Sequence, residues 1–70
     1  MNHEDVKKFI KEAIEKKMGI IIERTGKPKS YGLSRYELKS LEFNNSSISF
    51  MTDGEKSTID SSTIKSIEYD

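Results

Sequence analysis

Basic side chains and tyrosines gather in one stretch of this chain, between residues 24 and 39. The stretch holds five basic residues and one acid, whereas residues 40 to 70 hold two basic residues and six acids. Cationic side chains neutralise phosphate groups, and exposed aromatic rings stack on unpaired bases. The pattern therefore predicts a basic loop that binds nucleic acid or another anionic ligand. Six residues are expected to form this site: Arg24, Lys27, Lys29, Tyr31, Arg35 and Tyr36.

The same residues also have a structural interpretation. Lysine and arginine protect exposed loops and edge strands from aggregation, and Tyr36 would then belong to the core. The formal net charge of the chain is zero. This balance argues against a general polyanion binder, but it leaves room for a local basic patch.

Few residues are suited to catalysis or metal binding. The chain contains no cysteine and one histidine, His3, which excludes a thiolate zinc site, a cysteine nucleophile and a two-histidine metal site. The segment from Gly26 to Ser30 has the Gly-Lys pair of a phosphate loop, but it lacks the second glycine and the following helix that such a loop needs. We therefore expect no enzyme, no cofactor and no metal site.

Residues 3 to 18 carry the pattern of one amphipathic helix. Asn2 is the expected N-cap, and Gly19 is the expected left-handed residue after the last turn. Three consecutive isoleucines then predict a strand over residues 20 to 24. The apolar stripe of the helix recurs at the spacing of a single face. It comprises Val6, Phe9, Ile10, Ala13, Ile14 and Met18.

The stretch from Leu41 to Ile59 predicts a three-stranded antiparallel meander. Asp53-Gly54 is a strong signal for a two-residue hairpin turn, and Asn44-Asn45 is a weaker one. Residues equidistant from such a turn face each other and share one side of the sheet. Both turns select the same apolar face, which comprises Leu41, Phe43, Ile48, Phe50 and Ile59.

Residues 33 to 43 fit one long bent strand. Tyr36 and Leu38 share one face by numbering, whereas the apolar residues after them share the other. A β-bulge at Lys39-Ser40 would restore a common face and bend the strand, as a small barrel requires. A 3₁₀ turn over residues 60 to 63 and a last strand over residues 64 to 69 complete the expected order. The expected fold class is α+β, with an N-terminal amphipathic helix before a five-stranded, strongly bent antiparallel sheet or small barrel.

This order of elements resembles the Sm-like and SH3-like small barrels. It is similar, more narrowly, to the WYL domain, an Sm-like barrel of bacterial transcription regulators and defence systems. Residues 10 to 17 and 19 to 23 resemble that domain's helix and first strand. Ile48-Ser49-Phe50 stands in place of its Trp-Tyr-Leu triplet, and Thr63 stands in place of its arginine. The resemblance therefore implies the fold without the family's ligand-sensing residues.

Seventy residues make a single domain, 1–70, with the helix over about 3–18 and the barrel over about 19–70. No apolar run exceeds three residues, so neither a membrane span nor a signal-peptide core is expected, and the expected location is the cytoplasm. Two functions stay open. One is a small non-catalytic binding or regulatory module, bacterial or phage, for nucleic acid or another anionic ligand. The other is a protein–protein interaction module, either a phage or mobile-element inhibitor of a host protein or a self-associating barrel subunit.

Overall fold

A computed structural model describes residues 1–26 and 30–70 of the chain, and Lys27, Pro28 and Lys29 lie outside the described residues. Two helices, a 3₁₀ turn and six strands follow one another along the described chain. In order they are α1 (His3–Lys16), β1 (Ile20–Arg24), β2 (Tyr31–Leu33), α2 (Arg35–Leu38), β3 (Glu42–Phe43), β4 (Ser47–Thr52), β5 (Glu55–Asp60), η1 (Ser61–Thr63) and β6 (Ile64–Tyr69).

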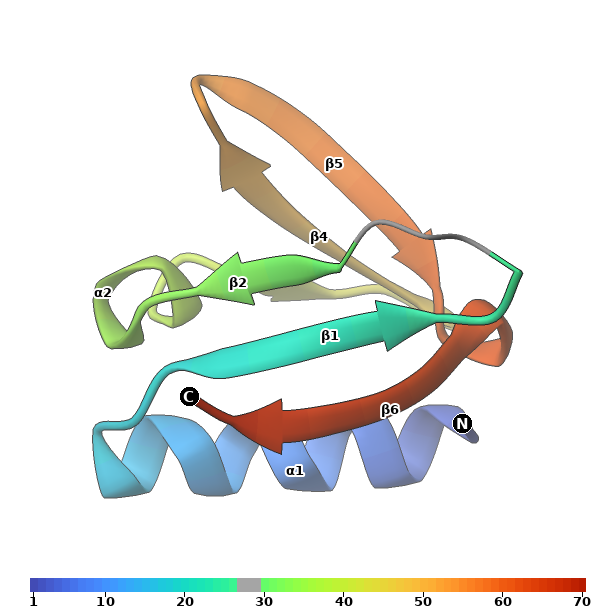
Figure 1. Cartoon of the computed structure of the whole chain (residues 1–70), viewed down its shortest axis with the longest axis horizontal. Coiled ribbons are helices and arrows are strands. Elements are labelled where there is room, and N and C mark those ends of the chain that lie inside the picture. Colours follow the sequence, from blue (N-terminus) through green and yellow to red (C-terminus); the bar gives the residue numbers. More distant parts are fainter. Residues whose placement is uncertain (27–29) are drawn as a thin grey trace.

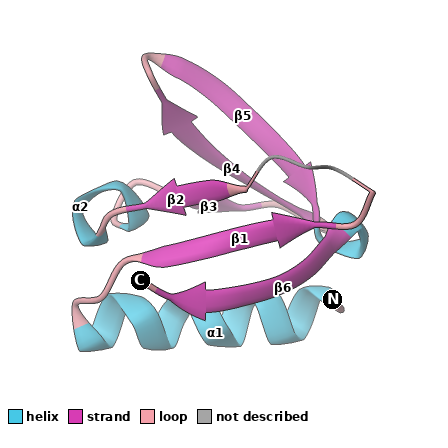
Figure 2. Cartoon of the chain, viewed as in Figure 1, coloured by secondary structure: helices cyan, strands magenta, loops and turns pink. Residues whose placement is uncertain are grey.

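The strands form two three-stranded antiparallel sheets. One has the order β2-β1-β6 and the other the order β3-β4-β5. Helix α1 lies along the first sheet and contacts β6, η1 and α2 (Figure 1). Figure 2 shows the β4–β5 hairpin leaning away from that sheet. The α+β class is confirmed, but within the described residues two sheets that do not close replace the expected five-stranded barrel.

The two ends of α1 differ in how well the sequence predicts them. The Oδ1 atom of Asn2 accepts from the backbone N–H of Glu4 at 2.8 Å, as expected of an N-cap. The left-handed residue at the other end is Lys17, with φ 57°, and the prediction of Gly19 for this role was wrong. Gly19 serves close packing instead, because a Cβ there would lie 2.8 Å from the carbonyl oxygen of Leu33.

The β4–β5 hairpin has the predicted turn and register. Asp53 and Gly54 have φ angles of 50° and 78°, both positive, as a type I′ turn requires. Thr52 lies opposite Glu55, and the pairing continues to Ile48 opposite Ile59. The 3₁₀ turn and the last strand are also confirmed, since η1 covers Ser61–Thr63 and β6 covers Ile64–Tyr69.

The β3–β4 connection is longer than predicted. Phe43 lies opposite Ile48 rather than opposite Ser46, and three residues, Asn44 to Ser46, connect β3 to β4. The N–H of Asn44 donates to the carbonyl of Ser47 at 2.9 Å and closes this turn. The error in register is two residues, and side chains alternate with a period of two, so the predicted apolar face survives.

The predicted long bent strand over residues 33 to 43 was wrong, because α2 interrupts it. Ser34 caps α2 through a capping box, in which its Oγ accepts from the N–H of Glu37 at 3.2 Å and its N–H donates to the Glu37 carboxylate at 2.9 Å. The single helical turn buries Leu38 and leaves Tyr36 65% exposed. The structural interpretation that placed Tyr36 in the core was therefore wrong.

The predicted bulge at Lys39-Ser40 was wrong for the same reason, because these residues follow a helix. A register irregularity does occur, between Glu23 and Arg24 where β1 pairs with β6. Ser66 lies opposite Glu23 and Ile64 lies opposite Arg24. The intervening residue of β6 thus has no partner, which allows both Ile64 and Ile67 to be buried.

The hydrophobic core lies between α1 and the two sheets. Its buried hydrophobic residues belong to α1, α2 and the strands β1, β2, β4, β5 and β6. The buried set is Val6, Ile10, Ala13, Ile20, Ile22, Leu33, Leu38, Ile48, Phe50, Ile59, Ile64 and Ile67. None of the helices in the described part of the chain has the length and the apolar character that crossing a bilayer needs.

A candidate anion-binding site between two helix ends

Helix α2 presents two of the predicted site residues to solvent. It is one turn long and buries Leu38, so Arg35 and Tyr36 lie on its outer side and are exposed. The Nη2 atom of Arg35 donates to Tyr36 Oη at 2.6 Å. The guanidinium carbon lies 4.8 Å from the centroid of the Tyr36 ring, within the range of a cation–π contact. Arg35 therefore contacts both the hydroxyl and the ring of Tyr36.

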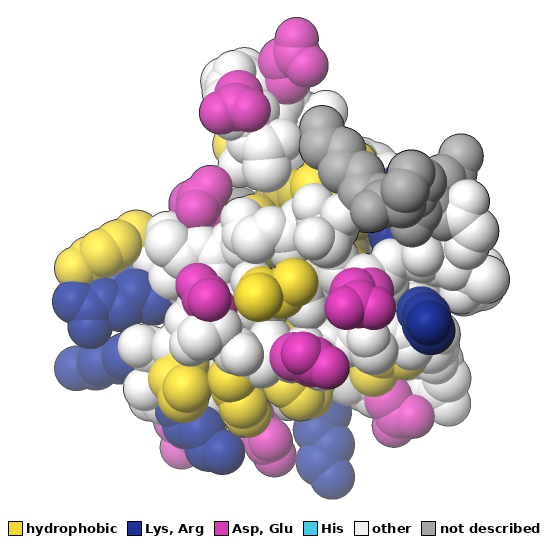
Figure 3. All heavy atoms as spheres, in the orientation of Figure 1, with side chains coloured by type: hydrophobic (Ala, Val, Ile, Leu, Met, Phe, Trp, Pro, Cys, Tyr) yellow, Lys and Arg dark blue, Asp and Glu magenta, His cyan; other side chains and the backbone are white. Residues whose placement is uncertain are grey.

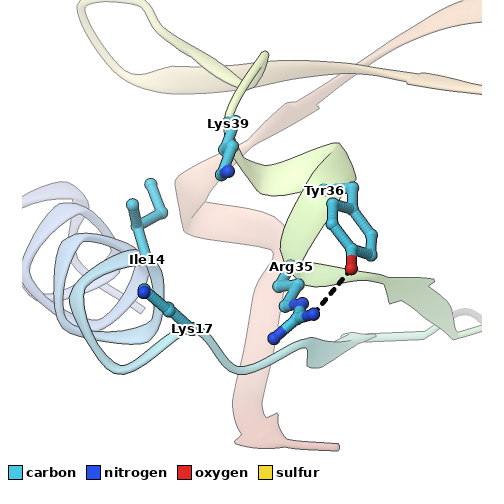
Figure 4. Close-up of a pocket in the computed structure, with 5 residues that line it drawn as sticks. All are labelled: Ile14, Lys17, Arg35, Tyr36 and Lys39. Atoms are coloured by element: carbon cyan, nitrogen blue, oxygen red, sulfur yellow. Dashed lines mark hydrogen bonds between the residues drawn. The ribbon is translucent and has the colours of Figure 1, made fainter.

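Two lysines complete a cationic surface around this ring. Lys39 follows α2, and its Nζ lies 6.0 Å from the Tyr36 centroid. Lys17 comes from the end of α1 and lines the same cavity, whose volume is about 180 Å³. Figure 4 shows Lys17 beside Ile14 at the end of α1, and Arg35, Tyr36 and Lys39 on or next to α2, around one space. Five described residues line it: Ile14, Lys17, Arg35, Tyr36 and Lys39.

The charged residues among the described lining of this cavity are all positive. Three of its described lining residues are cationic, one is aromatic, one is aliphatic and none is acidic. In Figure 3 basic side chains lie at the end where α2 is, and acidic side chains lie at the tip of the β4–β5 hairpin and across the middle of that face. Cations that share a cavity repel one another, and an anion between them would relieve this repulsion.

Lys17 reaches the cavity from an unusual backbone conformation. Its φ and ψ angles are 57° and 43°, in the left-handed region that side chains other than those of Gly, Asn and Asp seldom adopt. Its N–H donates to the carbonyl of Ile14 at 3.1 Å, which closes the end of the helix. Residues held in such conformations occur often at ligand sites.

The other predicted site residues lie elsewhere. Tyr31 begins β2, and its half-buried ring packs edge-on against Phe50, with centroids 5.4 Å apart. Arg24 ends β1, and its buried Nε has no hydrogen-bond partner among the described residues. These two residues lie at the end of the first sheet away from α2 (Figure 1). The structure thus brings Arg35 and Tyr36 together but does not bring Arg24 and Tyr31 to them. The predicted Lys27 and Lys29 fall outside the described residues.

Sequence reasoning missed Lys17 as a site residue and left Lys39 out of the predicted set. Lys17 enters the site because Gly19 allows the chain after α1 to approach the start of α2. A Cβ at Gly19 would lie 3.4 Å from the Cα of Ser34, the residue that caps α2. The capping box of Ser34 and Glu37 was the available signal for α2, and with it for the placement of Lys39.

Little else in the described chain is arranged for chemistry. No group of three His, Asp or Glu side chains among the described residues could hold a metal ion. Hydrogen bonds from the N–H and the Oγ of Ser62 lower the pKa of Asp60. A scan of protein-family models found no match, and searches of curated proteins and of solved structures found none either. What this chain binds is therefore inferred from the chemistry of the cavity.

Proposed function

We propose that this protein is a non-catalytic binding module that holds a phosphate-bearing ligand between the ends of α1 and α2. The observation that carries the proposal is the convergence of Lys17, Arg35 and Lys39 on one cavity whose described lining includes no carboxylate. Arginine and lysine are the side chains that proteins use most to hold phosphate groups.

The ligand class that fits best is single-stranded nucleic acid. Tyr36 is 65% exposed, and a base can stack on its open ring while nearby cations hold the adjoining phosphates. The cavity of about 180 Å³ is smaller than the roughly 300–1,000 Å³ of sites that enclose a whole small ligand. A site of this size suits one unit of a longer chain, with the rest of the ligand outside.

The remaining expectations about fold family and cellular role are part of the same proposal. In an Sm-like or SH3-like barrel a single bent strand would run from β2 into β3, and here these strands belong to different sheets and are joined through α2. Two other features, the helix at the start of the chain and the 3₁₀ turn before β6, support a relationship to the Sm-like and SH3-like barrels. The proposed role is a cytoplasmic regulatory module of a bacterium or phage.

A titration with single-stranded oligonucleotides tests the proposal. A labelled oligonucleotide of roughly 15 nucleotides, near the upper site size of a small barrel, would be followed by fluorescence anisotropy. If three cations contact phosphates, affinity should fall about 20-fold between about 50 mM and about 200 mM salt. A duplex of the same length serves as the comparison and should bind less tightly, because its bases cannot stack on Tyr36. The absence of any binding at the lower salt concentration would contradict the proposal.

A further inference from the structure

Strand β5 is an unpaired edge in the described structure. It is the last strand in the order β3-β4-β5, and β4 is its one partner among the described strands. The residues that flank a two-residue hairpin turn form a hydrogen-bonded pair, and hydrogen-bonded and non-hydrogen-bonded pairs then alternate along the strands. Thr52 and Glu55 flank the turn here, so Ser57 and Ile59 also bond to β4.

The far end of the hairpin confirms this alternation. The N–H of Ser61 donates to the carbonyl of Ser46 at 2.8 Å, as expected of the next hydrogen-bonded pair after Ile48 and Ile59. The residues between these pairs direct their backbone N–H and C=O groups away from β4. They are Lys56, Thr58 and Asp60, and all three are exposed. The carbonyl of Asp60 also accepts from Thr63 Oγ1 at 2.7 Å. The remaining outward groups of this row are a template for a further strand.

We propose that this edge pairs antiparallel with β5 of a second copy of the chain, with the two-fold axis at Thr58. Outward-directed residues must then face outward-directed residues, which limits the possible registers. With the axis at Thr58, Lys56 lies opposite Asp60 of the second copy, and Asp60 lies opposite Lys56 of the second copy. The pairing forms two opposite-charge pairs and leaves no like charges facing each other.

The neighbouring registers are less complementary. An axis at Lys56 places two ammonium groups opposite each other, and an axis at Asp60 does the same for two carboxylates. An axis at Ser57 places Lys56 opposite Thr58, and an axis at Ile59 places Asp60 opposite Thr58. In both registers the charged residue faces a neutral one. Lysine on an edge strand often prevents pairing, but on this edge its counterpart in the favoured register is an aspartate.

The resulting assembly would be a continuous six-stranded sheet with the order β3-β4-β5-β5-β4-β3. One pair of six-residue strands buries little surface, so the contact belongs with the small interfaces of transient complexes. The association is therefore weak and depends on concentration. It is also independent of the cavity between α1 and α2, because no residue of β5 lines that cavity.

Single-cysteine variants read the register directly, since the chain contains no cysteine. In the proposed dimer the two Cα atoms at position 58 face each other at about 5.5 Å, within the range that a disulfide spans. The two Cα atoms at position 56 are offset by four residues and lie roughly 14 Å apart, beyond that range. Thr58→Cys and Lys56→Cys are thus a matched pair of exposed substitutions on one strand.

Mild oxidation of each variant, followed on non-reducing gels and by mass spectrometry, gives the answer. Thr58→Cys should form a covalent dimer at least about tenfold faster than Lys56→Cys. Equal rates, or faster crosslinking at position 56, would overturn the proposed register.

Sedimentation equilibrium of the unmodified protein is the second measurement. Its average mass should rise with concentration, and a mass that stays monomeric up to about 1 mM would overturn self-association. Lys56→Glu replaces both opposite-charge pairs with like-charge pairs and should weaken the dimer about tenfold. The control Lys65→Glu lies on β6, outside the contact, and should leave the dimer unchanged. An equal effect of the two substitutions would also overturn the pairing.

Discussion

Lys17 and Arg35 line the same cavity, although Lys17 follows α1 and Arg35 begins α2. Gly19 lies against the carbonyl of Leu33 and so allows the chain after α1 to approach the start of α2. The backbone of Lys17 is left-handed, a conformation that favours glycine. A lysine at this position should lower the free energy of unfolding while it supplies a cation to the cavity. Both effects can be measured.

Replacing Lys17 with glycine should separate stability from binding. Lys17→Gly relieves the left-handed strain and should raise the free energy of unfolding by about 0.5–1 kcal/mol. The same change removes one cation from the cavity and should weaken oligonucleotide binding several-fold at low salt. Urea unfolding and anisotropy titrations measure the two effects.

The matched control is Lys16→Gly, one residue earlier and within α1. Glycine in a helix should lower the free energy of unfolding by about 1 kcal/mol, and this variant should bind the oligonucleotide as the unmodified protein does. If both substitutions lowered the free energy of unfolding, the conformation of Lys17 would not be strained.

Tyr36 should contribute to binding through its ring rather than its hydroxyl. Stacking of a base on an aromatic side chain contributes about 1–3 kcal/mol, so Tyr36→Ala should weaken binding of a single strand at least about fivefold. Tyr36→Phe keeps the ring and loses only the hydrogen bond from Arg35, so its affinity should stay within about threefold. Thermal unfolding should be nearly unchanged in both, because Tyr36 is mostly exposed. Equal losses of affinity in the two variants would argue against stacking.

Gly19 should tolerate no side chain, whereas Gly32 should tolerate one. A Cβ at Gly19 would lie 2.8 Å from a backbone oxygen, whereas a Cβ at Gly32 would meet nothing within 4 Å. Gly19→Ala should therefore lower the free energy of unfolding by about 1–3 kcal/mol, since the backbone of Leu33 must shift. Gly32→Ala should be neutral or slightly stabilising. Urea unfolding of both variants checks this, and an unaffected Gly19→Ala would contradict the close approach of Gly19 to Leu33 and Ser34.

The acid limb of stability should depend on Asp60. Hydrogen bonds from Ser62 to the Asp60 carboxylate hold its pKa below the ordinary value of 3.8. A carboxyl group whose pKa is lower in the folded state stabilises the fold above that ordinary value, and the contribution is lost as pH falls through the folded pKa.

Asp60→Asn removes this charge and should lower the melting temperature at pH 7. The difference from the unmodified protein should shrink below about pH 4 and vanish once Asp60 is protonated. Melting curves across this range, at low protein concentration, measure it. A difference that stays constant with pH would contradict the role of the carboxylate charge.

Local signals in the sequence were sufficient for much of the fold. The apolar stripe predicted α1, and the Asp53-Gly54 turn predicted the register of β4 and β5, because both depend on neighbouring residues alone. A strand was wrongly predicted over residues 33 to 43 because the alternation of apolar residues was given more weight than the helix-capping residues. Ser34 and Glu37 form a capping box, and one helical turn reverses the parity that a bulge had been expected to correct.

The candidate site was only partly predictable. Arg35 and Tyr36 are adjacent in the sequence and lie within the basic stretch, so that stretch predicts both of them. Lys17 depends on tertiary packing, namely the close approach of Gly19 to the start of α2, and no local pattern reports such an approach. Arg24 and Tyr31 were grouped with the site by sequence position, whereas the strands carry them to the other end of the sheet.

The most direct measurement is the salt dependence of oligonucleotide affinity in a charge-removed variant. Three cations on phosphates predict that log K falls against log salt with a slope of about −2 for the unmodified protein. Substituting Lys17, Arg35 and Lys39 with glutamine should bring the slope close to zero and abolish most of the affinity. A control with the same loss of charge, at Lys8, Lys11 and Lys65, should keep most of the slope. Binding that is absent in the unmodified protein, or equal slopes in the two variants, would contradict an anion site between α1 and α2.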